Sequence, residues 1–290
     1  MSTSWTRWPA PAKLNLFLHI VGRRADGYHL LQTVFQLLDW GDIVQLRLRD
    51  DGNIVRQDAI AGVSEAQDLG LRAALALKAH TGSSLGAEIR IDKKIPIGAG
   101  LGGGSSDAAS VLVGLNELWD TGCSPEELAR IGLSLGADVP VFVIGQSAWA
   151  EGIGERLTPL VLPPRYFVIV DPGVSIATGS LFQAPELTRN SPPTTITDYL
   201  EEFGAGTTNV FAPIARARYP QLAAAMEWLG RFGEVRLSGS GSAIFAAVDS
   251  EARAREITGR CPPEFRARVA RGLNRSLLLD ARDQFRVARA

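Results

Sequence analysis

A run of glycines at residues 98–104 constrains the fold of this chain more than any other feature. Within GAGLGGG only Ala99 and Leu101 are not glycine, and glycine loses more conformational entropy on folding than any other residue. The strand pattern AEIRID (87–92) precedes the run, and apolar residues at helical spacing follow it as far as Trp119. So many glycines between a strand and a helix exceed the needs of a turn, and they predict a loop whose backbone holds a ligand.

Two familiar glycine motifs do not explain the run. The stretch GAGLGG matches GxGxxG, but a dinucleotide-binding unit needs a second strand after the helix, with an acidic residue at its end. Here a second helix follows instead, and Glu117 lies inside the first helix. A Walker A loop requires Gly-Lys-Ser/Thr, whereas Gly104 is followed by Ser105 and Ser106. The sequence therefore disfavours both motifs.

A phosphate cradle and a structural turn with a serine cap remain, and the glycine content favours the cradle. Closely spaced glycines let several backbone N–H groups converge on an anion, and the helix N-terminus adds the favourable end of its dipole. Ser105 and Ser106 are placed to cap that helix and to offer hydroxyls to a phosphate or its magnesium ion. A second glycine loop, SGSGS at 238–242, is by itself equally consistent with a tight hairpin. Together the two loops predict a cleft lined by backbone donors from both halves of the chain.

The predicted elements are a mixture of strands and helices. Residues 13–21 alternate in polarity, which predicts a strand with one buried face and with Lys13 and Asn15 together on the other side. Residues 30–38 fit a helix about as well as a strand. Further helices are predicted at 67–80, from a capping box at Ser124 to about residue 135, at 209–217 and at 220–230, and further strands in IVQLRLR, in YFVIVDP and on both sides of the second glycine loop.

Length and composition indicate a mixed α/β (α+β) protein of two domains with a central cleft. The 290 residues exceed the roughly 100–200 of a usual single domain, and prolines interrupt any regular element at 157–167. We therefore expect an N-terminal domain over residues 1–160 and a C-terminal α+β domain over residues 161–290.

Charge and residue counts exclude several classes of partner. The formal net charge of −1 argues against a nucleic-acid binder, and the arginines between Arg253 and Arg275 are predicted to lie on a solvated helix face. Two cysteines and three histidines provide no disulfide scaffold, zinc quartet or HExxH motif, so we assign no metal ligand and expect a cytoplasmic protein. No stretch approaches the ~18 apolar residues of a membrane helix, so no membrane partner is expected either.

Three blocks of sequence resemble one enzyme family closely. They are PAKLNLFLHIVGRRADGYHLLQTVFQLLD (11–39), PIGAGLGGGSSDAA (96–109) and GADVPVFVIG (136–145). These blocks resemble the 4-diphosphocytidyl-2-C-methyl-D-erythritol kinases, a branch of the superfamily of galactokinase, homoserine kinase, mevalonate kinase and phosphomevalonate kinase. SGSGSAIFA (238–246) is similar to the third motif of that superfamily, and WAEGIGERLTPL (149–160) extends the resemblance over most of the chain.

The resemblance implies a fold and a reaction. The fold would be that of a two-domain small-molecule kinase, with an N-terminal ATP-binding domain and the substrate held between the domains. ATP, with Mg²⁺, would phosphorylate the 2-hydroxyl of 4-diphosphocytidyl-2-C-methyl-D-erythritol, a step of non-mevalonate isoprenoid precursor synthesis. The implied partners are ATP and this cytidyl diphosphate substrate, and a homodimer is left open.

The resemblance also implies what individual residues do, beginning with Asp138 as the catalytic carboxylate and Lys13 as its partner. A nearby carboxylate can orient a tertiary alcohol and accept its proton, and an ammonium group keeps that carboxylate ionised. Whether Asp138 removes the proton early or mainly orients the hydroxyl is left open. Substrate contacts are implied for Asn15, Tyr28, His29, Thr178 and Phe182, ATP contacts for Asp68, Pro96, Gly98, Ala99, Gly100, Leu101, Gly102, Gly103, Gly104, Ser105 and Ser106, and a contribution of the second glycine loop for Gly239, Ser240 and Gly241.

Alternatives stand beside these assignments. Asp68 occupies a position where the family often has asparagine, which leaves the exact adenine contact open. Without the resemblance, Asp138 is consistent with a helix cap, Lys13 with a solvated strand end and Phe182 with a core residue. Another kinase of the superfamily is disfavoured because its substrates contain no base for Tyr28 and Phe182 to stack on. A non-catalytic sugar or nucleotide sensor is disfavoured because Asp138 and Lys13 are both present.

Overall fold

The computed structural model describes residues 4–60, 62–201 and 204–289, and within them the strands form one ten-stranded sheet. The main path is β3-β4-β2-β10-β7-β9-β8, while β1 and β5 also pair with β2, and β6 pairs with β5. The strands are β1 (Thr6–Arg23), β2 (His29–Arg49), β3 (Ile54–Arg56), β4 (Gly86–Asp92), β5 (Ala148–Gly152), β6 (Arg156–Pro159), β7 (Tyr166–Asp171), β8 (Arg236–Leu237), β9 (Ile244–Val248) and β10 (Arg266–Leu273). The helices are η1 (Glu65–Gln67), α1 (Leu69–Thr81), α2 (Gly103–Trp119), α3 (Pro125–Leu133), α4 (Val139–Ile144), α5 (Thr178–Phe182), α6 (Ile196–Glu201), α7 (Ala212–Arg218), α8 (Pro220–Gly230), α9 (Glu251–Gly259) and α10 (Leu277–Arg289).

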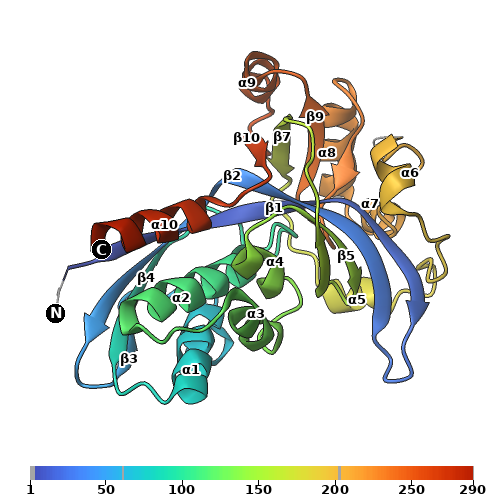
Figure 1. The fold of residues 1–290 in the computed structure, drawn as a ribbon. Helices are drawn as coiled ribbons and strands as arrows, with labels where there is room; N and C mark the ends of the chain where they lie inside the picture. Colours follow the sequence, from blue (N-terminus) through green and yellow to red (C-terminus); the bar gives the residue numbers. More distant parts are fainter. Residues whose placement is uncertain (1–3, 61, 202–203, 290) are drawn as a thin grey trace.

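A long hairpin of β1 and β2 runs through both halves of the molecule (Figure 1). The two strands pair antiparallel from Thr6 opposite Leu46 to Arg23 opposite His29. Residues 30–38, whose pattern fitted either a helix or a strand, lie in β2. This part of β2 pairs with β1 on one side and with β5 on the other, so its backbone groups are bonded only as a strand. Tertiary pairing thus decides what local periodicity left open.

The prediction of one buried face for β1 is wrong, because both faces are covered. The polar pair Lys13 and Asn15 is 2% and 3% exposed. The register against β2 also shifts between Asn15 and Leu18, and such an irregularity changes which residues face each side. Leu14 therefore packs with the core beneath β7 and β9, whereas Leu18 and Ile20 belong to the core around α7 and α8.

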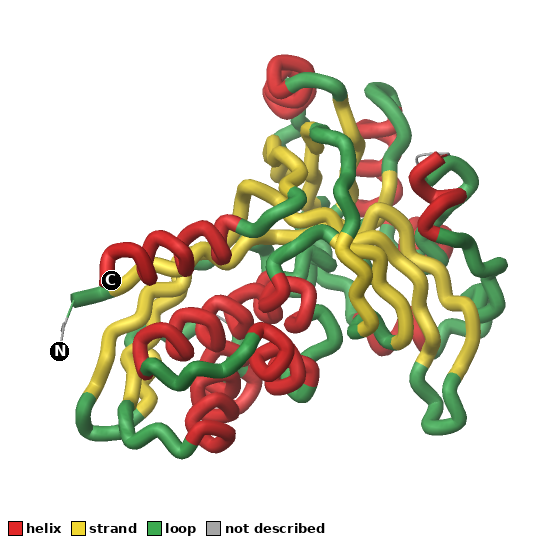
Figure 2. Tube along the Cα trace, viewed as in Figure 1, coloured by secondary structure: helices red, strands yellow, loops and turns green. Residues whose placement is uncertain are grey.

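The helices α1 to α4 gather on one face of the sheet formed by β1, β2 and β4 (Figures 1 and 2). The predicted helix after the glycine run is confirmed as α2, and its apolar side chains lie in the centre of this first core. The C-terminal helix α10 returns to the same half of the molecule, where the ring of Phe285 lies 5.3 Å from that of Trp8. The N-terminus of α2, and with it the glycine run, is thereby fixed by a large apolar core.

A second core surrounds β7 and β9, with α5, α7 and α8 packed against them. The two halves share one sheet, because β10 pairs with both β2 and β7. β6 ends at Pro159 and β7 begins at Tyr166, so the expected domain boundary near residue 160 falls in their connection and stays a prediction. No helix in the described ranges combines the length and apolar character needed to cross a bilayer.

Most of the other predicted elements are confirmed, and one is corrected. The capping box at Ser124 and Glu127 begins α3, and the predicted strand, turn and strand around the second glycine loop are β8 and β9. The arginines from Arg253 to Arg275, however, share no single helix face. The helix α9 ends at Gly259, before Pro262, and the chain then continues as β10 beside β7. Proline cannot continue the helix, and the free edge of β7 offers backbone partners instead.

Candidate active site

The glycine run forms the wall of a pocket of about 300 Å³ whose lining includes Asp68, Lys93 and the segment from Ile95 to Ser105. Gly98, Gly100 and Gly102 have φ values of +72°, +75° and +74°, a conformation that favours glycine. At Gly100 a Cβ atom would lie only 2.1 Å from the carbonyl oxygen of Ser238. The glycines therefore allow the first loop to pack directly against the second.

The predicted serine cap of the following helix is wrong. The N-cap of α2 is Gly102, which has no side chain, and Ser105 and Ser106 lie inside the first turn. Ser106 donates its backbone N–H to the carbonyl of Gly102 over 2.8 Å. Its hydroxyl is buried and has no hydrogen-bond partner among the described residues. Because the glycine backbone itself shapes the helix start, the two serine hydroxyls are not used in capping.

Asp68 lines the pocket at the glycine run but is already engaged by its own helix. It is the N-cap of α1, and its Oδ1 accepts hydrogen bonds from the backbone N–H groups of Gly70 (2.8 Å) and Leu71 (3.2 Å). Its other oxygen lies 3.6 Å from Nε of Arg56. A contact from Asp68 to an adenine amino group would therefore be shared with these partners, and it stays a prediction.

A buried charged cluster behind the glycine loop was missed by the sequence analysis. The ammonium group of Lys93 pairs with Asp42 and, over 2.7 Å, with Asp107 of α2. Asp42 also accepts backbone hydrogen bonds from Lys94 and Ile95, at the entry to the loop. Burial raises the pKa of Asp107 to about 7, with attraction by Lys93 opposing the shift and repulsion by Asp42 adding to it. The cluster links β2, the glycine loop and α2 through ion pairs and hydrogen bonds. The only signal for it in the sequence was Asp107, directly after the glycine–serine run.

Lys13 and Asp138 meet where the glycine loop joins a larger cleft. Nζ of Lys13 lies 3.3 Å from Oδ2 of Asp138, donates to the carbonyl of Gly100 over 3.0 Å and bonds Oδ1 of Asn15. The side chain of Lys13 is 3% exposed and that of Asp138 is 34% exposed. Lys13 is thus not a solvated strand end. It is a buried cation that presents one accessible carboxylate to the cleft.

Asp138 occupies the N-cap position of α4 without acting as a cap. Within the described residues its carboxylate accepts no hydrogen bond from the α4 backbone. Asn15, on the other side of Lys13, has partners of its own: its Nδ2 donates to Oγ1 of Thr33 over 3.0 Å, and its backbone N–H donates to Oγ of Ser238 over 3.2 Å. It also lines the cleft, so its substrate contact stays a prediction. The carboxylate of Asp138 is therefore held by Lys13 and is open to a ligand.

The cleft has a volume of about 770 Å³ and brings together most of the remaining predicted residues. Its lining includes Lys13, Asn15, Tyr28, His29, Asp138, Thr178, Phe182, Gly239 and Ser240, together with Gly98, Gly100 and Gly102, which also line the smaller pocket. Gly241 is not among them, because its backbone N–H donates to Ser238 inside the turn. The two cavities thus adjoin at the glycine loop.

The far end of the cleft is aromatic. The rings of His29 and Phe182 stack, with centroids 4.9 Å apart and planes at 26°, and Phe182 also meets Phe211 edge-on. Tyr28 is 61% exposed and extends the hairpin tip. Burial, with repulsion from Arg189 and Arg23, lowers the pKa of His29, which favours the neutral imidazole. A neutral histidine that stacks on Phe182 and directly follows Tyr28 in the chain suits the recognition of a planar, uncharged ring.

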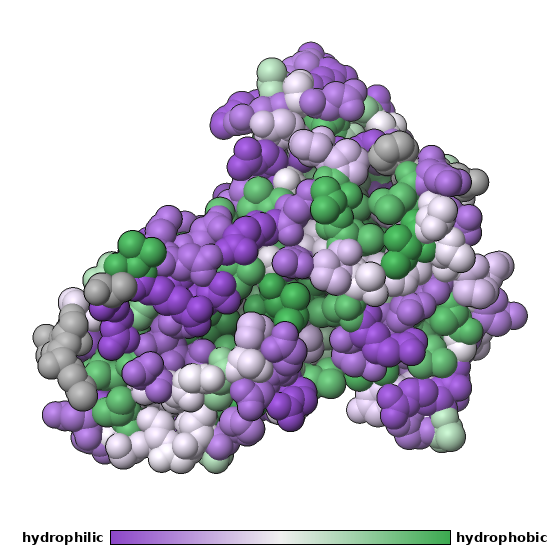
Figure 3. Space-filling view, in the orientation of Figure 1, coloured by the Kyte–Doolittle hydropathy of each residue, from purple (hydrophilic) through white to green (hydrophobic). Residues whose placement is uncertain are grey.

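The two glycine loops and α5 close the cleft between the halves of the molecule. Thr178, at the start of α5, shares a hydrogen bond of 2.6 Å with Ser240. Ala243 donates its backbone N–H to the carbonyl of Ala99 over 3.0 Å. Figure 3 shows hydrophilic residues over most of the visible face of the molecule, with hydrophobic ones at its centre and over the C-terminal elements at the upper right. The expected cleft lined by both loops is therefore present.

Comparison with known proteins places this geometry in a family. Residues 68–146 match the GHMP kinases N terminal domain, and residues 189–265 match the GHMP kinases C terminal domain. A 4-diphosphocytidyl-2-C-methyl-D-erythritol kinase from Xanthomonas campestris pv. campestris (strain B100) is 55% identical over 285 residues, covering 98% of this chain and 96% of that protein. The protein of the same name from Halorhodospira halophila (strain DSM 244 / SL1) is 53% identical over 279 residues, covering 95% and 96%.

Solved structures agree with these matches. A crystal structure of 4-(cytidine 5'-diphospho)-2C-methyl-D-erythritol kinase is 34% identical, with a TM-score of 0.77, and covers 92% of this chain and 99% of that one. The mevalonate kinase of Methanococcus jannaschii is 17% identical, with a TM-score of 0.67 and coverage of 94% and 99%, which shows a shared fold.

Proposed function

The chain belongs to the 4-diphosphocytidyl-2-C-methyl-D-erythritol kinase family, and from this premise we propose which of its residues carry the reaction. It is an ATP-dependent kinase of isoprenoid precursor synthesis. The observation that carries the proposal is the Lys13–Asp138 pair, which lies where the smaller pocket, lined by the glycine run, adjoins the larger cleft. A phosphoryl donor on one side and an alcohol on the other would meet at this carboxylate.

In the proposed step, the 2-hydroxyl of the substrate forms a bond to the γ-phosphorus of ATP, while the bond from that phosphorus to the β–γ bridging oxygen breaks. The hydroxyl proton passes to Asp138, and ADP leaves. The ammonium group of Lys13, 3.3 Å from Oδ2 of Asp138, holds this carboxylate in place and offsets charge on the transferring group. Asn15, fixed by Lys13 and Thr33, holds the ammonium group in place.

The smaller pocket is proposed to hold the nucleotide. The backbone of Gly98–Gly104 would surround the phosphates at the N-terminus of α2, where the helix dipole favours negative charge. Mg²⁺ is part of this proposal as the companion of ATP. The hydroxyl of Ser105, which lines this pocket, is a hard oxygen donor of the kind this ion prefers and would hold it. When bound, the ion would offset the negative charge of the phosphates.

The aromatic end of the cleft is proposed to bind the cytosine ring. Tyr28 offers an exposed ring face, and neutral His29, backed by Phe182, offers nitrogen atoms for the polar edge of the base. Thr178 lies beside Ser240 at the cleft wall, within reach of the middle of an extended substrate. The domain division at residue 160, a cytoplasmic location and a homodimer stay predictions from the sequence.

The experiment that tests the proposed function is release of ADP by the purified full chain with ATP and Mg²⁺. It compares 4-diphosphocytidyl-2-C-methyl-D-erythritol with mevalonate and homoserine. We expect ADP release with the cytidyl substrate alone. Release with mevalonate or homoserine would support another kinase of the superfamily. ATP binding without ADP release from any substrate would support the non-catalytic sensor.

A further inference from the structure

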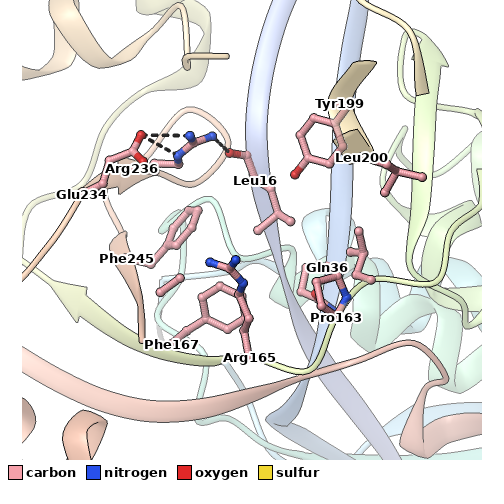
Figure 4. Close-up of a pocket in the computed structure, with 12 residues that line it drawn as sticks. Leu16, Gln36, Pro163, Arg165, Phe167, Tyr199, Leu200, Glu234, Arg236 and Phe245 are labelled. Carbon is pink, nitrogen blue, oxygen red and sulfur yellow. Dashed lines mark hydrogen bonds and ion pairs between the residues drawn. The ribbon is translucent and has the colours of Figure 1, made fainter. Parts of the chain in front are cut away.

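A third cavity, shown in Figure 4, lies on the opposite side of β1 from the proposed reaction cleft. It is bounded by β1, β2, β7, β8 and β9, by α6, and by the connection between β6 and β7. Leu16 lines this cavity, whereas its neighbour Asn15 lines the cleft. Among the described residues, none lines both this cavity and either of the other two. The cavity is therefore separate from the proposed machinery.

The inner wall of the cavity is apolar and fixed. Phe167 and Phe245 are each 2% exposed, and their rings meet edge-on with centroids 5.8 Å apart. The accessible volume is about 170 Å³. An engineered protein cavity of about 150 Å³ lined by apolar side chains holds one benzene molecule. A single six-membered ring, or a branched chain of similar size, thus fits against this wall.

A cation held by neutral oxygens and one exposed carboxylate closes the other end. The guanidinium group of Arg236 donates to the carbonyls of Leu16 (2.8 Å) and Gly204 (3.2 Å) and to Oγ1 of Thr207 (3.1 Å). Its carboxylate partner among the described residues is Glu234, whose Oε1 lies 3.0 Å from Nε and 2.9 Å from Nη2 and whose side chain is 72% exposed. An ion pair on the solvent side contributes little, so neutral oxygens hold most of this charge in place. An anion inside the cavity would replace the exposed carboxylate of Glu234 as the counter-ion of Arg236.

Two further donors face the same space. Figure 4 shows the guanidinium group of Arg165 among the lining residues, beside Phe167, and the hydroxyl of Tyr199 turned toward the same space. Burial raises the pKa of Tyr199 to about 12, although Arg236 and Arg165 pull it the other way. The phenol therefore stays protonated at neutral pH and can donate a hydrogen bond.

We propose that this cavity is a second small-molecule site, which takes a single-ring or short branched hydrocarbon carrying one carboxylate or phosphate group. The hydrocarbon would lie against Phe167 and Phe245, and the anionic group would pair with Arg236 and accept from Tyr199. Binding at this site requires no turnover, so it can be tested whatever the outcome of the kinase assay.

The test measures the heat of binding of benzoate, phenyl phosphate and uncharged benzyl alcohol to the full chain. We expect benzoate to bind with a dissociation constant on the order of 1 mM and benzyl alcohol about tenfold more weakly. Glu234→Gln, which removes the exposed carboxylate from Arg236, should tighten benzoate binding several-fold. Ala247→Trp should abolish it, because Ala247 is exposed and lines the cavity, and an indole there would fill the space.

Ala252→Trp is the matched control, since Ala252 is an exposed alanine of α9 outside the cavity. This variant should bind benzoate as the wild type does, and thermal melting should show that all three variants are folded. The proposal is overturned if benzoate gives no heat at about 20 mM, if benzyl alcohol binds equally well, or if folded Ala247→Trp still binds benzoate. If Ala247→Trp does not fold, unchanged or weaker binding by Glu234→Gln overturns it. Ala247→Trp can separate the two anions: if it abolishes benzoate binding but still binds phenyl phosphate, the phenyl phosphate binds in the smaller pocket at the glycine run. The proposed site then takes carboxylates only.

Discussion

The two ends of the proposed reaction cleft are built differently. At the phosphate end, Lys13 is almost fully buried and bonds Asn15, Gly100 and Asp138, and the two glycine loops touch backbone to backbone. At the base end, the Tyr28 ring is 61% exposed at a hairpin tip, and contacts between rings replace fixed hydrogen bonds.

This difference separates chemistry from recognition. The charged groups proposed to act on the transferring phosphoryl group are already positioned in the free chain, so little reorganisation would accompany the reaction. The groups proposed to select the base would complete their contacts only when the base supplies the missing partner. Substitutions at the phosphate end should therefore change turnover or folding, and those at the base end should change substrate affinity.

The largest expected effect is that of Asp138→Asn. It removes the proton acceptor and leaves the shape of the cleft, so kcat should fall by about 10²–10⁴ with KM for both substrates changed less than about threefold. Steady-state ADP release measures both constants. Glu126→Gln, an exposed carboxylate of the neighbouring α3, is the control and should leave both unchanged. Near-normal turnover of Asp138→Asn would remove this carboxylate from the mechanism.

Gly100→Ala tests the rigidity of the phosphate end through stability. Its Cβ would lie 2.1 Å from the carbonyl oxygen of Ser238, at a φ of +75°, so the two loops must separate. Urea denaturation should show the free energy of unfolding lowered by about 2–4 kcal/mol. Gly122→Ala measures the cost of the left-handed backbone conformation alone, because Gly122 has a φ of +69° and no atom within 4 Å of its Cβ position. It should cost about 1 kcal/mol, and equal losses in the two variants would show that the loops are not tightly packed.

Asp107→Asn tests the charged cluster behind the loop through pH. The pKa of Asp107 is raised from 3.8 to about 7 in the folded chain, so folded protein holds a proton that unfolded protein has released. The free energy of unfolding should therefore fall as pH rises between roughly 4 and 7, and level off above. Asparagine cannot titrate, so the variant should match the wild type near pH 4 and exceed its stability by about 1–3 kcal/mol at pH 8. If the free energies of unfolding of the variant and the wild type differ by the same amount at every pH from roughly 4 to 8, the pKa of about 7 does not belong to Asp107.

The smallest effect is expected at the base end. Tyr28→Ala should raise KM for the cytidyl substrate about tenfold, because one stacking face is lost, and leave KM for ATP and the melting temperature unchanged. Tyr28→Phe keeps the ring and should behave like the wild type. Equal increases of KM for both substrates would mean that the two ends are not independent.

The sequence predicted those features of the molecule that depend on neighbouring residues better than those that depend on distant ones. Local patterns predicted α1, α2, α3 and the strands on both sides of the second loop, because caps, proline and helical or alternating spacing act within a few residues. They also predicted the strand at 13–21, which lies in β1, but not that both of its faces are covered, because the irregularity between Asn15 and Leu18 and the elements packed on each face depend on distant parts of the chain. The Lys93 cluster was missed for the same reason, since its partners lie 51 and 14 residues away.

The residues of the candidate site were found by resemblance rather than by local pattern. Lys13 and Asp138 are 125 positions apart, and only the fold brings Nζ to within 3.3 Å of the carboxylate. The glycine run was the exception, because its composition alone predicted a ligand-holding loop; the ligand stays a prediction, and the structure adds that Gly100 packs against Ser238. The cavity behind β1 had no sequence signal, because five strands and one helix contribute to it.

The most direct test of the central claim, that Lys13 and Asp138 act as one unit at the junction of the two pockets, is the kcat of Lys13→Met, Asp138→Asn and the double variant. Melting curves would first establish that all three are folded. If the pair acts as one unit, the kcat of the double variant should lie within about threefold of the kcat of the slower single variant. A kcat for the double variant that equals the product of the two single losses would show that the residues act independently, and would contradict the account.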